Sequence, residues 1–355
     1  MLKPHPDSPA PLCVEICAGA GGQALGLESA GFAHLALIEQ DSDACQTLRS
    51  NKPEWNVIQA DVRRISTEPL PLGAGQLSLF AGGVPCPPFS LAGKQLGPDD
   101  DRDLFPAALA LISRLRPRAV LLENVKGLLQ GKFAPYRTEM VRQLAGLGYM
   151  AEWRLLHACD YGVPQLRPRS VLVALEPVAF RHFRWPEPAT SSATAPFVGD
   201  VLHASMASLG WELADAWAQQ AQRIAPTLCG GSRKHGGPDL GPSRARQAWA
   251  EMGVNGSSLA DAPPSPGDTL PVKLTVNQMA LLQGFPPDWA FAGRKTSAYR
   301  QVGNAFPPPV AAAIGASVAS ALAQAEGAER NLSPQAERTG SSRRVFAATS
   351  PCATS

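Results

Sequence analysis

Residues 77–90 read LSLFAGGVPCPPFS, in which an apolar run gives way to two glycines, three prolines and one cysteine. The apolar run predicts a buried strand. Proline fixes φ and donates no backbone hydrogen bond, so the strand is expected to end in a loop with few conformations. Ligands of open α/β sheets bind at the carboxyl edge of the strands. Cys86 would lie at that edge, where it is a candidate nucleophile, although a buried structural cysteine has the same sequence signature.

The composition is that of a globular protein with room for two domains. The chain has 355 residues, of which 45% are apolar and 17% charged, and its net charge is +2. A nucleic-acid surface would therefore have to be local. The seven cysteines are irregularly spaced and include no C-x-x-C pair. This usage favours a reducing compartment over a disulfide framework or a metal site.

The sequence predicts neither export nor a membrane span. No apolar run reaches the roughly 18 residues that a spanning helix needs. Residues 1–10 are polar and rich in proline, and they lack the apolar centre of a signal peptide. A cytoplasmic protein is therefore expected. Residues 1–10 and 326–355 are expected to be disordered, because they hold too few apolar residues to form a core.

Strands and helices alternate in the first part of the chain. Strands are expected at Leu12–Ile16, Leu35–Ile38 and Val57–Ala60, and a helix at Gln23–Ala30. Between the first strand and this helix, residues 17–22 read CAGAGG. A strand, a glycine turn and a helix in succession present backbone N–H groups and a helix N-terminus to a nucleotide-like ligand.

An acidic residue stands at the end of each of these strands, namely Glu15, Glu39 and Asp61. Glu39 follows Gly19 by 20 residues, the spacing at which a carboxylate reaches the hydroxyls of a ribose. The glycine turn fits the dinucleotide-binding fingerprint only loosely. The residues alone therefore leave open NAD, another nucleoside cofactor and an ordinary strand-to-helix turn.

A carboxylate is predicted beside Cys86. The expected strand Ala119–Leu122 ends at Glu123 and would neighbour the strand that precedes Cys86, so both side chains could face one pocket. Burial there would raise the pKa of Glu123 and favour its protonated form. The alternative is a glutamate that caps the next helix.

Polar side chains alternate before a later strand. Gln165, Arg167 and Arg169 lie between the expected strands Ala151–Ala158 and Ser170–Leu175, so in extended chain they project to one face. Two guanidinium groups on one face suit a phosphate or a base carbonyl. A solvated edge strand would give the same pattern.

The pattern weakens between residues 177 and 272, which are rich in Pro, Gly and Ser. Within them, residues 223–249 hold five basic side chains against one acid, and this local excess suits a DNA backbone. Helices are expected again at 275–283 and 310–324. The five basic residues are Arg223, Arg233, Lys234, Arg244 and Arg246.

Taken in this order, the segments resemble the DNA cytosine-C5 methyltransferases over roughly residues 12–325. The resemblance implies S-adenosyl-L-methionine as the cofactor instead of NAD. It also implies an α/β fold, Rossmann-like, with a mixed seven-stranded sheet and a small target-recognition domain. The blocks that carry the resemblance are residues 15–22, 85–90, 123–125, 165–169 and 300–304.

The resemblance implies a division of the chain as well. Residues 11–176 would form the cofactor-binding catalytic domain, 177–298 the target-recognition region, and 299–325 a segment that returns to the catalytic domain. Sequence recognition is expected mainly in residues 228–272, because the stretch between the last strand and Arg223 is short.

Two residues depart from the family pattern. Cys17 stands where the family usually has a phenylalanine that packs on the cofactor's adenine. Pro87 stands where glutamine is common. The first departure bears on cofactor affinity and the second carries little weight.

By the same resemblance, Cys86 would attack C6 of a flipped-out cytosine, Glu123 would hold N3 and supply a proton, and Arg169 with Arg167 would contact the base carbonyl. The implied cofactor contacts are Cys17, Ala18, Gly19, Ala20, Gly21, Gly22, Glu39, Asp61, Val62, Pro85, Leu104 and, near the methionine part, Asn304. The implied DNA contacts are Ser90, Gln165, Arg223, Thr227, Arg233, Lys234 and Arg244.

The expected function is a site-specific DNA cytosine-C5 methyltransferase of a bacterial restriction–modification system, acting on double-stranded DNA as a monomer without a metal. A cognate endonuclease that cuts the same site is an implied partner, without direct contact. One rival is a transfer-RNA cytosine methyltransferase of the same fold, against which the basic 223–249 segment speaks. The other is a catalytically idle DNA-binding protein, against which Cys86, Glu123 and Arg169 speak.

Overall fold

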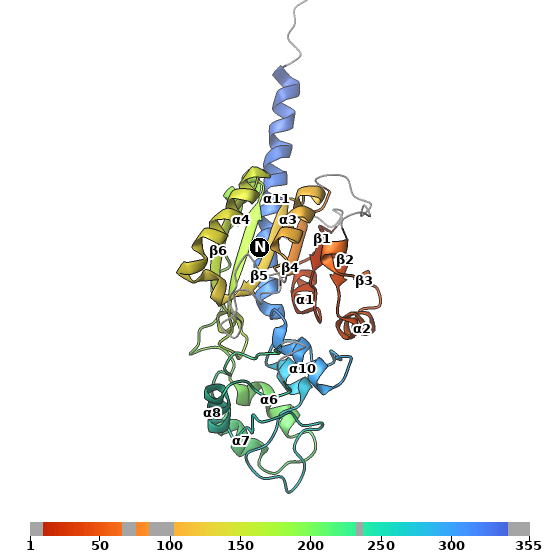
Figure 1. Ribbon diagram of the computed structural model, residues 1–355. Coiled ribbons are helices and arrows are strands. Elements are labelled where there is room, and N and C mark those ends of the chain that lie inside the picture. The colour runs from red at the N-terminus through yellow and green to blue at the C-terminus, as the bar shows by residue number, and fades with distance from the viewer. Residues whose placement is uncertain (1–9, 66–75, 85–102, 232–236, 340–355) are drawn as a thin grey trace, which may run out of the picture.

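A computed structural model describes residues 10–65, 76–84, 103–231 and 237–339 of the chain. The molecule is elongated (Figure 1). One lobe holds a β-sheet with helices on both faces, and the other lobe holds short helices and loops. Helix α11 (Pro308–Thr339) runs along the sheet lobe and extends beyond it.

Seven strands form a single sheet in the order β3-β2-β1-β4-β5-β7-β6. β7 runs antiparallel to both of its neighbours, and the other neighbouring strands are parallel. The predicted mixed seven-stranded sheet is therefore confirmed. The strands are β1 Leu12–Ile16, β2 Ala33–Glu39, β3 Val57–Gln59, β4 Leu79–Gly83, β5 Ala119–Val125, β6 Met150–His157 and β7 Pro168–Leu175.

Helices cover the sheet on both faces, which explains why its central strands are apolar on both sides. α3 (Phe105–Leu115) and α4 (Ala134–Gly146) cover one face. α1 (Gly22–Ser29), α5 (Pro177–His182) and α11 cover the other. α2 (Ser42–Asn51) packs beside β2 and β3.

The strand order reverses between β1 and β4. The chain runs outward from β1 to β3 and then continues from β4 in the opposite direction across the sheet. Such a switch point leaves a crevice at the carboxyl ends of the two central strands. The glycine turn of residues 17–22 follows β1, and β4 ends at Gly83 beside it, so the topology brings the turn and the end of β4 to this crevice.

Among the described residues, the second lobe contains α6 to α8 from the region where the sequence pattern weakens, together with α9 and α10 from the C-terminal part of the chain. These helices are short and separated by Pro and Gly, so they lack a long apolar period. Trp217 and Trp249 are fully buried and form the centre of their core. The helices are α6 (Val198–Met206), α7 (Ala214–Gln220), α8 (Ser243–Glu251), α9 (Val276–Leu281) and α10 (Lys295–Asn304).

The chain returns to the sheet lobe before residue 299. The indole Nε1 of Trp289 donates to the carbonyl of Ala20 at 3.1 Å. The amide of Asn51 bonds both the N–H and the carbonyl of Ala290, at 2.9 and 2.7 Å. The stretch 289–292 thus contacts the glycine turn and α2 together.

The prediction of disorder is wrong for residues 326–339. α11 continues past residue 325 as far as Thr339, so these residues are helical. Most of them, including Ala, Glu, Gln and Arg, favour helix, and they extend a helix whose first part is anchored in the core, despite Gly327 and Pro334. Residues 1–9 and 340–355 lie outside the described residues.

The stretch Lys295–Ala328 is long and apolar enough to cross a membrane by length and composition, which the sequence expectation did not include. More than half of its most apolar window, 56%, is buried inside the protein. Its burial against α1 and the sheet is that of a core helix.

The backbone of α1 at Gly26 lies close against the start of α11. A Cβ there would lie 2.4 Å from the Pro308 carbonyl oxygen and 2.6 Å from the Ala311 Cβ. Backbone atoms cannot move aside easily, so α1 and α11 require glycine at this point.

We expect Gly26→Ala to lower the free energy of unfolding by about 1–3 kcal/mol, because the overpacking outweighs the better helix propensity of alanine. Gly146→Ala on α4 is the control, since no atom lies within 4 Å of the added Cβ. It should leave stability unchanged or slightly raised. Urea unfolding of both variants checks this, and equal stabilities would refute the packing argument.

Candidate active site

Glu123 and Arg169 form an ion pair at the carboxyl end of β5. Arg169 Nε lies 2.8 Å from Glu123 Oε1, and the two residues are only 9% and 7% exposed. Antiparallel pairing of β5 with β7 brings them together, since Val125 lies opposite Arg169 and Glu123 opposite Val171. The reversed direction of β7 is thus what delivers an arginine to the end of a parallel strand.

Burial raises the pKa of Glu123. The attraction of Arg169 and Arg167 opposes this rise and offsets it only in part. A carboxyl group in this position holds a proton more readily than one in water, and it can donate that proton to a base.

The end of β4 lies beside Glu123. Gly83 is in register with Glu123, and a Cβ on Gly83 would lie 3.4 Å from Glu123 Oε2. The side-chain amide of Asn124 donates to the carbonyl of Val84 at 3.1 Å. Cys86 follows Val84 by two positions in the sequence; Pro85, Cys86 and Ser90 lie outside the described residues.

The turn of residues 17–22 has the backbone that its glycines predict. Gly19 and Gly21 have φ of 54° and 88°, and Cys17 also has a positive φ, 51°. The Gly19 N–H donates to Glu39 Oε2 at 2.8 Å. A Cβ on Gly19 would meet nothing within 4 Å, whereas one on Gly22 would lie 2.3 Å from the Phe306 carbonyl oxygen. Gly19 therefore faces open space, and Gly22 is packed against the returning chain.

Glu15 is a buried carboxylate without a partner among the described residues. It is 1% exposed, and neither of its oxygens accepts a hydrogen bond. Burial raises its pKa, and the nearby charge of Glu39 raises it further. An unpaired group of this kind is costly unless a ligand satisfies it.

Three carboxylates gather around Cys17. Burial chiefly raises the pKa of its thiol, and the charges of Glu39, Glu15 and Asp61 add to the rise. The orphaned oxygens of Glu15 beside an open glycine turn fit a ligand with an ammonium group, as S-adenosyl-L-methionine has. Within the described parts of the chain, no group of three or more His, Cys, Asp or Glu could hold a metal ion.

The other expected cofactor residues lie at varied positions. The Asp61 carboxylate is bound by Arg63 at 2.5 Å, which lowers the pKa of Asp61. Val62 and Leu104 are buried. Asn304 is exposed, and its amide donates to the Gly231 carbonyl at 3.1 Å.

Gln165 and Arg167 are interior residues, and this contradicts the DNA and base contacts expected of their side chains. Both are fully buried. The Gln165 amide bonds the backbone of Leu282 and Leu228, at 3.2 and 2.9 Å. Arg167 donates to the carbonyls of Leu228, Gly303 and Ala305 at 2.8, 2.9 and 2.7 Å. The alternation was predicted correctly, but the shared face points into the protein.

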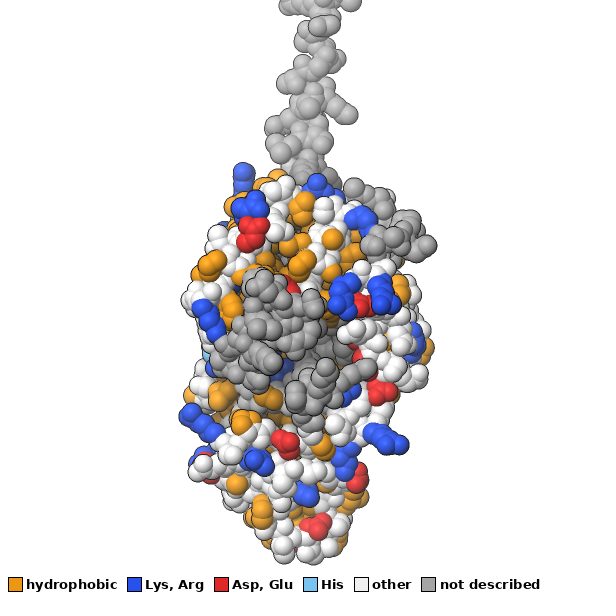
Figure 2. Space-filling model, in the orientation of Figure 1, with side chains coloured by type: hydrophobic (Ala, Val, Ile, Leu, Met, Phe, Trp, Pro, Cys, Tyr) orange, Lys and Arg blue, Asp and Glu red, His pale blue; other side chains and the backbone are white. Residues whose placement is uncertain are grey.

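The expected DNA contacts are only partly described. Arg223 is exposed but paired with Glu251 at 2.5 Å. Thr227 is half-buried, and Arg244 is exposed on α8. Arg233 and Lys234 lie outside the described residues. On the face in Figure 2, Lys and Arg side chains occur on both lobes among fewer acidic ones.

Sequence reasoning missed two residues of this site. Glu15 was seen only as a strand terminus, and its burial could have been suspected from the apolar residues that flank it. Trp289 fixes the glycine turn through the Ala20 carbonyl from 269 residues away, and no local pattern signals such a contact.

The chain matches known proteins over most of its length. A model of the family described as C-5 cytosine-specific DNA methylase matches residues 12–320. Type II methyltransferase M.NaeI of Lentzea aerocolonigenes is 56% identical over 321 residues, covering 89% of this chain and 77% of that protein. Type II methyltransferase M.NgoMIV of Neisseria gonorrhoeae is 50% identical over 312 residues, covering 87% and 97%.

A solved structure shares the fold at low sequence identity. The methyltransferase EhMeth of Entamoeba histolytica superposes with a TM-score of 0.59 at 14% identity, over 88% of this chain and 98% of that one. The likeness extends across both lobes.

Arg167 and Arg169 should respond differently to loss of charge. Arg167→Met would remove a charged donor from three backbone carbonyls, of which, among the described residues, only that of Ala305 keeps another donor, the Gln283 amide, and it is expected to lower the free energy of unfolding by about 3 kcal/mol or more. Arg169→Gln should cost less stability, because Glu123 can take up a proton, and should lose most methyl transfer. Thermal unfolding and methylation assays on both variants check this, and a stable but inactive Arg167→Met would contradict it.

Proposed function

This chain belongs to the C-5 cytosine-specific DNA methylase family and methylates cytosine in DNA at C5; from that premise we propose that Cys86, Glu123 and Arg169 carry out the reaction. The observation that best supports this is the buried Glu123–Arg169 pair beside the end of β4, three residues before Cys86. β4 ends beside Glu123, and the proposed nucleophile follows the end of β4 by three positions in the sequence.

The role proposed for Cys86 follows from the weak nucleophilicity of cytosine C5. Addition of the Cys86 thiolate to C6 gives C5 the character of an enamine, which can accept a methyl group. Cysteine suits this task because part of it is thiolate at neutral pH. The C6 atom is shielded in a stacked duplex, so the base must leave the helix, at a cost of a few kcal/mol.

Glu123 is proposed to bind the N3 edge of the base and to supply a proton there as negative charge develops. Its raised pKa supports that role, because the group retains a proton when the base needs one. Arg169 would orient Glu123 through the ion pair and contact the carbonyl of the base. Arg167 is assigned to positioning the backbone instead of to chemistry.

Members of this family use S-adenosyl-L-methionine, which when bound supplies an electrophilic methyl group. We assign the residues of the 17–22 turn and Glu39 to holding it, with Glu15 proposed for its ammonium group. Asp61, Val62, Leu104 and Asn304 stay in the proposed set. Cys17 would present a small side chain where the family has an aromatic ring, so the adenine would have less contact area on that side.

Double-stranded DNA is the proposed substrate, with sequence recognition mainly in residues 228–272. The basic side chains of α8 support this, since the sheet lobe already supplies the chemistry. By the type II designation of its relatives, a restriction endonuclease that cuts the same sequence is a proposed partner. We place the enzyme in the cytoplasm, where the DNA lies, as a monomer.

Cys86→Ser should slow methyl transfer by at least about 10²-fold while DNA binding persists, because the nucleophile alone is removed. DNA that carries 5-fluorocytosine at the target should trap the wild type as an adduct that survives denaturing electrophoresis. The serine variant is the control and should give no adduct. Near-normal methylation by the variant would contradict the covalent mechanism.

Glu123→Gln should lower kcat by about 10²–10⁴-fold, since the amide keeps a similar shape but has no proton to give. The wild type should lose activity as pH rises through the raised pKa of Glu123, because the donor form disappears there. The variant should lack that alkaline decline. A variant with the wild-type pH profile would remove Glu123 from proton transfer.

Exchange of residues 228–272 for the same segment of a relative with another target tests where the sequence is read. The hybrid should methylate the donor's sites, because the segment would bring its own base contacts. Mapping of methylated cytosines is the measurement. An active hybrid that keeps the original target would move recognition to residues 180–222.

A further inference from the structure

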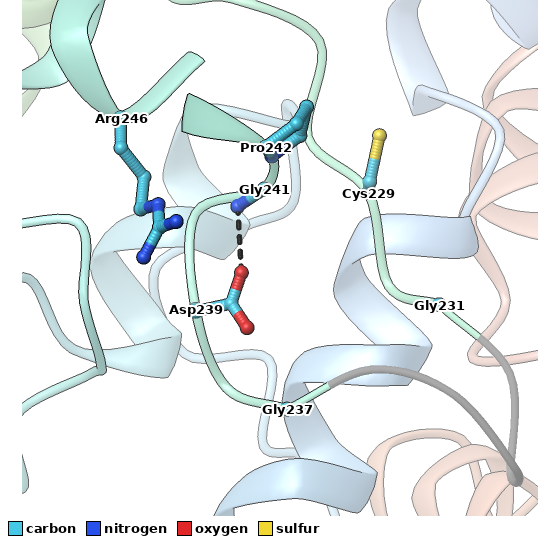
Figure 3. Close-up of a pocket in the computed structure, with 7 residues that line it drawn as sticks. All are labelled: Cys229, Gly231, Gly237, Asp239, Gly241, Pro242 and Arg246. Carbon is cyan, nitrogen blue, oxygen red and sulfur yellow. Dashed lines mark hydrogen bonds between the residues drawn. The ribbon is translucent and has the colours of Figure 1, made fainter. Parts of the chain in front are cut away.

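A pocket of about 380 Å³ opens at the start of α8, in the segment to which recognition is assigned. The Arg246 side chain extends from α8 beside the loop that carries Asp239, and Cys229 lies on the segment across from it (Figure 3). Such a volume suits the edge of a nucleobase. The lining residues are Cys229, Gly231, Gly237, Asp239, Gly241, Pro242 and Arg246.

The guanidinium of Arg246 is available to a ligand. Among the residues that the structure describes, it has neither a hydrogen bond nor an ion pair, whereas Arg223 of the same lobe is held by Glu251. Its stem nevertheless contacts the neighbouring chain. A Cβ on Gly256 would lie 3.1 Å from Arg246 Cγ, so the stem packs on the Gly256 backbone. That backbone is itself bonded, since the Gly256 carbonyl accepts from Leu240 N–H at 3.0 Å.

Asp239 gives the pocket an acceptor next to this donor. Its Oδ1 accepts from the Gly241 N–H at 2.9 Å, which fixes the direction of the carboxylate. A carboxylate in the pocket repels phosphate, so a contact limited to the DNA backbone is disfavoured. A donor fork and an acceptor together match a base pair instead. Arginine pairs with O6 and N7 of guanine in the major groove, and aspartate accepts from N4 of cytosine.

The wall opposite Arg246 is joined to the catalytic lobe. Arg167 holds the Leu228 carbonyl, and Asn304 holds the Gly231 carbonyl. Between them Gly230 is pressed against α10, where a Cβ on Gly303 would lie 2.3 Å from the Gly230 N. The pocket is thus fixed relative to Arg169, two residues after Arg167.

We propose that Arg246 and Asp239 read one G·C pair of the target site, with Arg246 donating to guanine O6 and N7 and Asp239 accepting from cytosine N4. The inference rests on the proposed recognition role of residues 228–272. Arg246 is then a specificity-determining residue, because its stem packs beside the pocket and its guanidinium can form two parallel hydrogen bonds with guanine.

The test is competition binding of the full-length enzyme to its target duplex and to duplexes with each base pair replaced in turn. Arg246→Gln, which keeps part of the stem, is compared with Arg294→Gln, an exposed arginine outside the pocket and outside residues 228–272. The wild type should bind a duplex in which one G·C pair is replaced roughly 5- to 150-fold more weakly than the target duplex, as expected for one bidentate contact. Arg246→Gln should lose that difference at this pair alone, and Arg294→Gln should keep it.

Three results would overturn the assignment. In the first, Arg246→Gln binds every duplex more weakly by the same factor, so all base-pair preferences remain. The slope of log K against log salt concentration also falls by about one, as expected when a phosphate contact is lost. In the second, Arg246→Gln keeps both the base-pair preferences and the affinity of the wild type. It could also lose all binding while circular dichroism shows it folded, which a single base contact cannot cause.

A different result would contradict the assignment of sequence recognition to residues 228–272, on which this inference rests. If the wild type methylates a defined sequence and the exchange of residues 228–272 leaves that sequence unchanged, recognition lies elsewhere whatever Arg246→Gln does. If that exchange alters the target but Arg246→Gln retains the wild-type preference at every pair, only the role of Arg246 is wrong.

Discussion

The ion pair between Arg169 and Glu123 can form only because β7 enters the sheet antiparallel to β5. In an all-parallel sheet the chain before β7 would lie at the opposite edge, far from the end of β5. The same entry segment carries Arg167, which fixes the backbone of Leu228, Gly303 and Ala305. A few alternating residues therefore hold the proposed proton donor, the start of the proposed recognition segment and the returning chain in one arrangement.

Close backbone approach completes this arrangement. Gly26 admits α11, Gly22 admits the Phe306 carbonyl, and Gly230 and Gly303 let the start of the proposed recognition segment meet α10. Each contact leaves no room for a methyl group, so the relative position of the two lobes is set by packing and not by a linker. Such rigidity suits an enzyme that must hold a cytosine at one place while it reads bases at another.

The sheet and the catalytic edge could be predicted from the sequence because their signals are local. Apolar runs ending at Glu15, Glu39 and Glu123 mark strands and their carboxyl ends, and the glycine turn marks the first crossover. The inward direction of Arg167 and Gln165 could not be predicted, since alternation defines a face but not what covers it. The contact of Trp289 with Ala20 and the short helices α6 to α8 likewise depend on residues far apart in the chain.

Bisulfite sequencing of a plasmid from cells that express this protein tests the account most directly, with Cys86→Ser as the matched control. A cytosine within one recurring sequence should resist conversion in the wild-type sample, because it carries a C5 methyl group. The same cytosine should convert fully in the control sample. Full conversion in both samples, or protected cytosines without a common sequence, would contradict a site-specific cytosine-C5 methyltransferase.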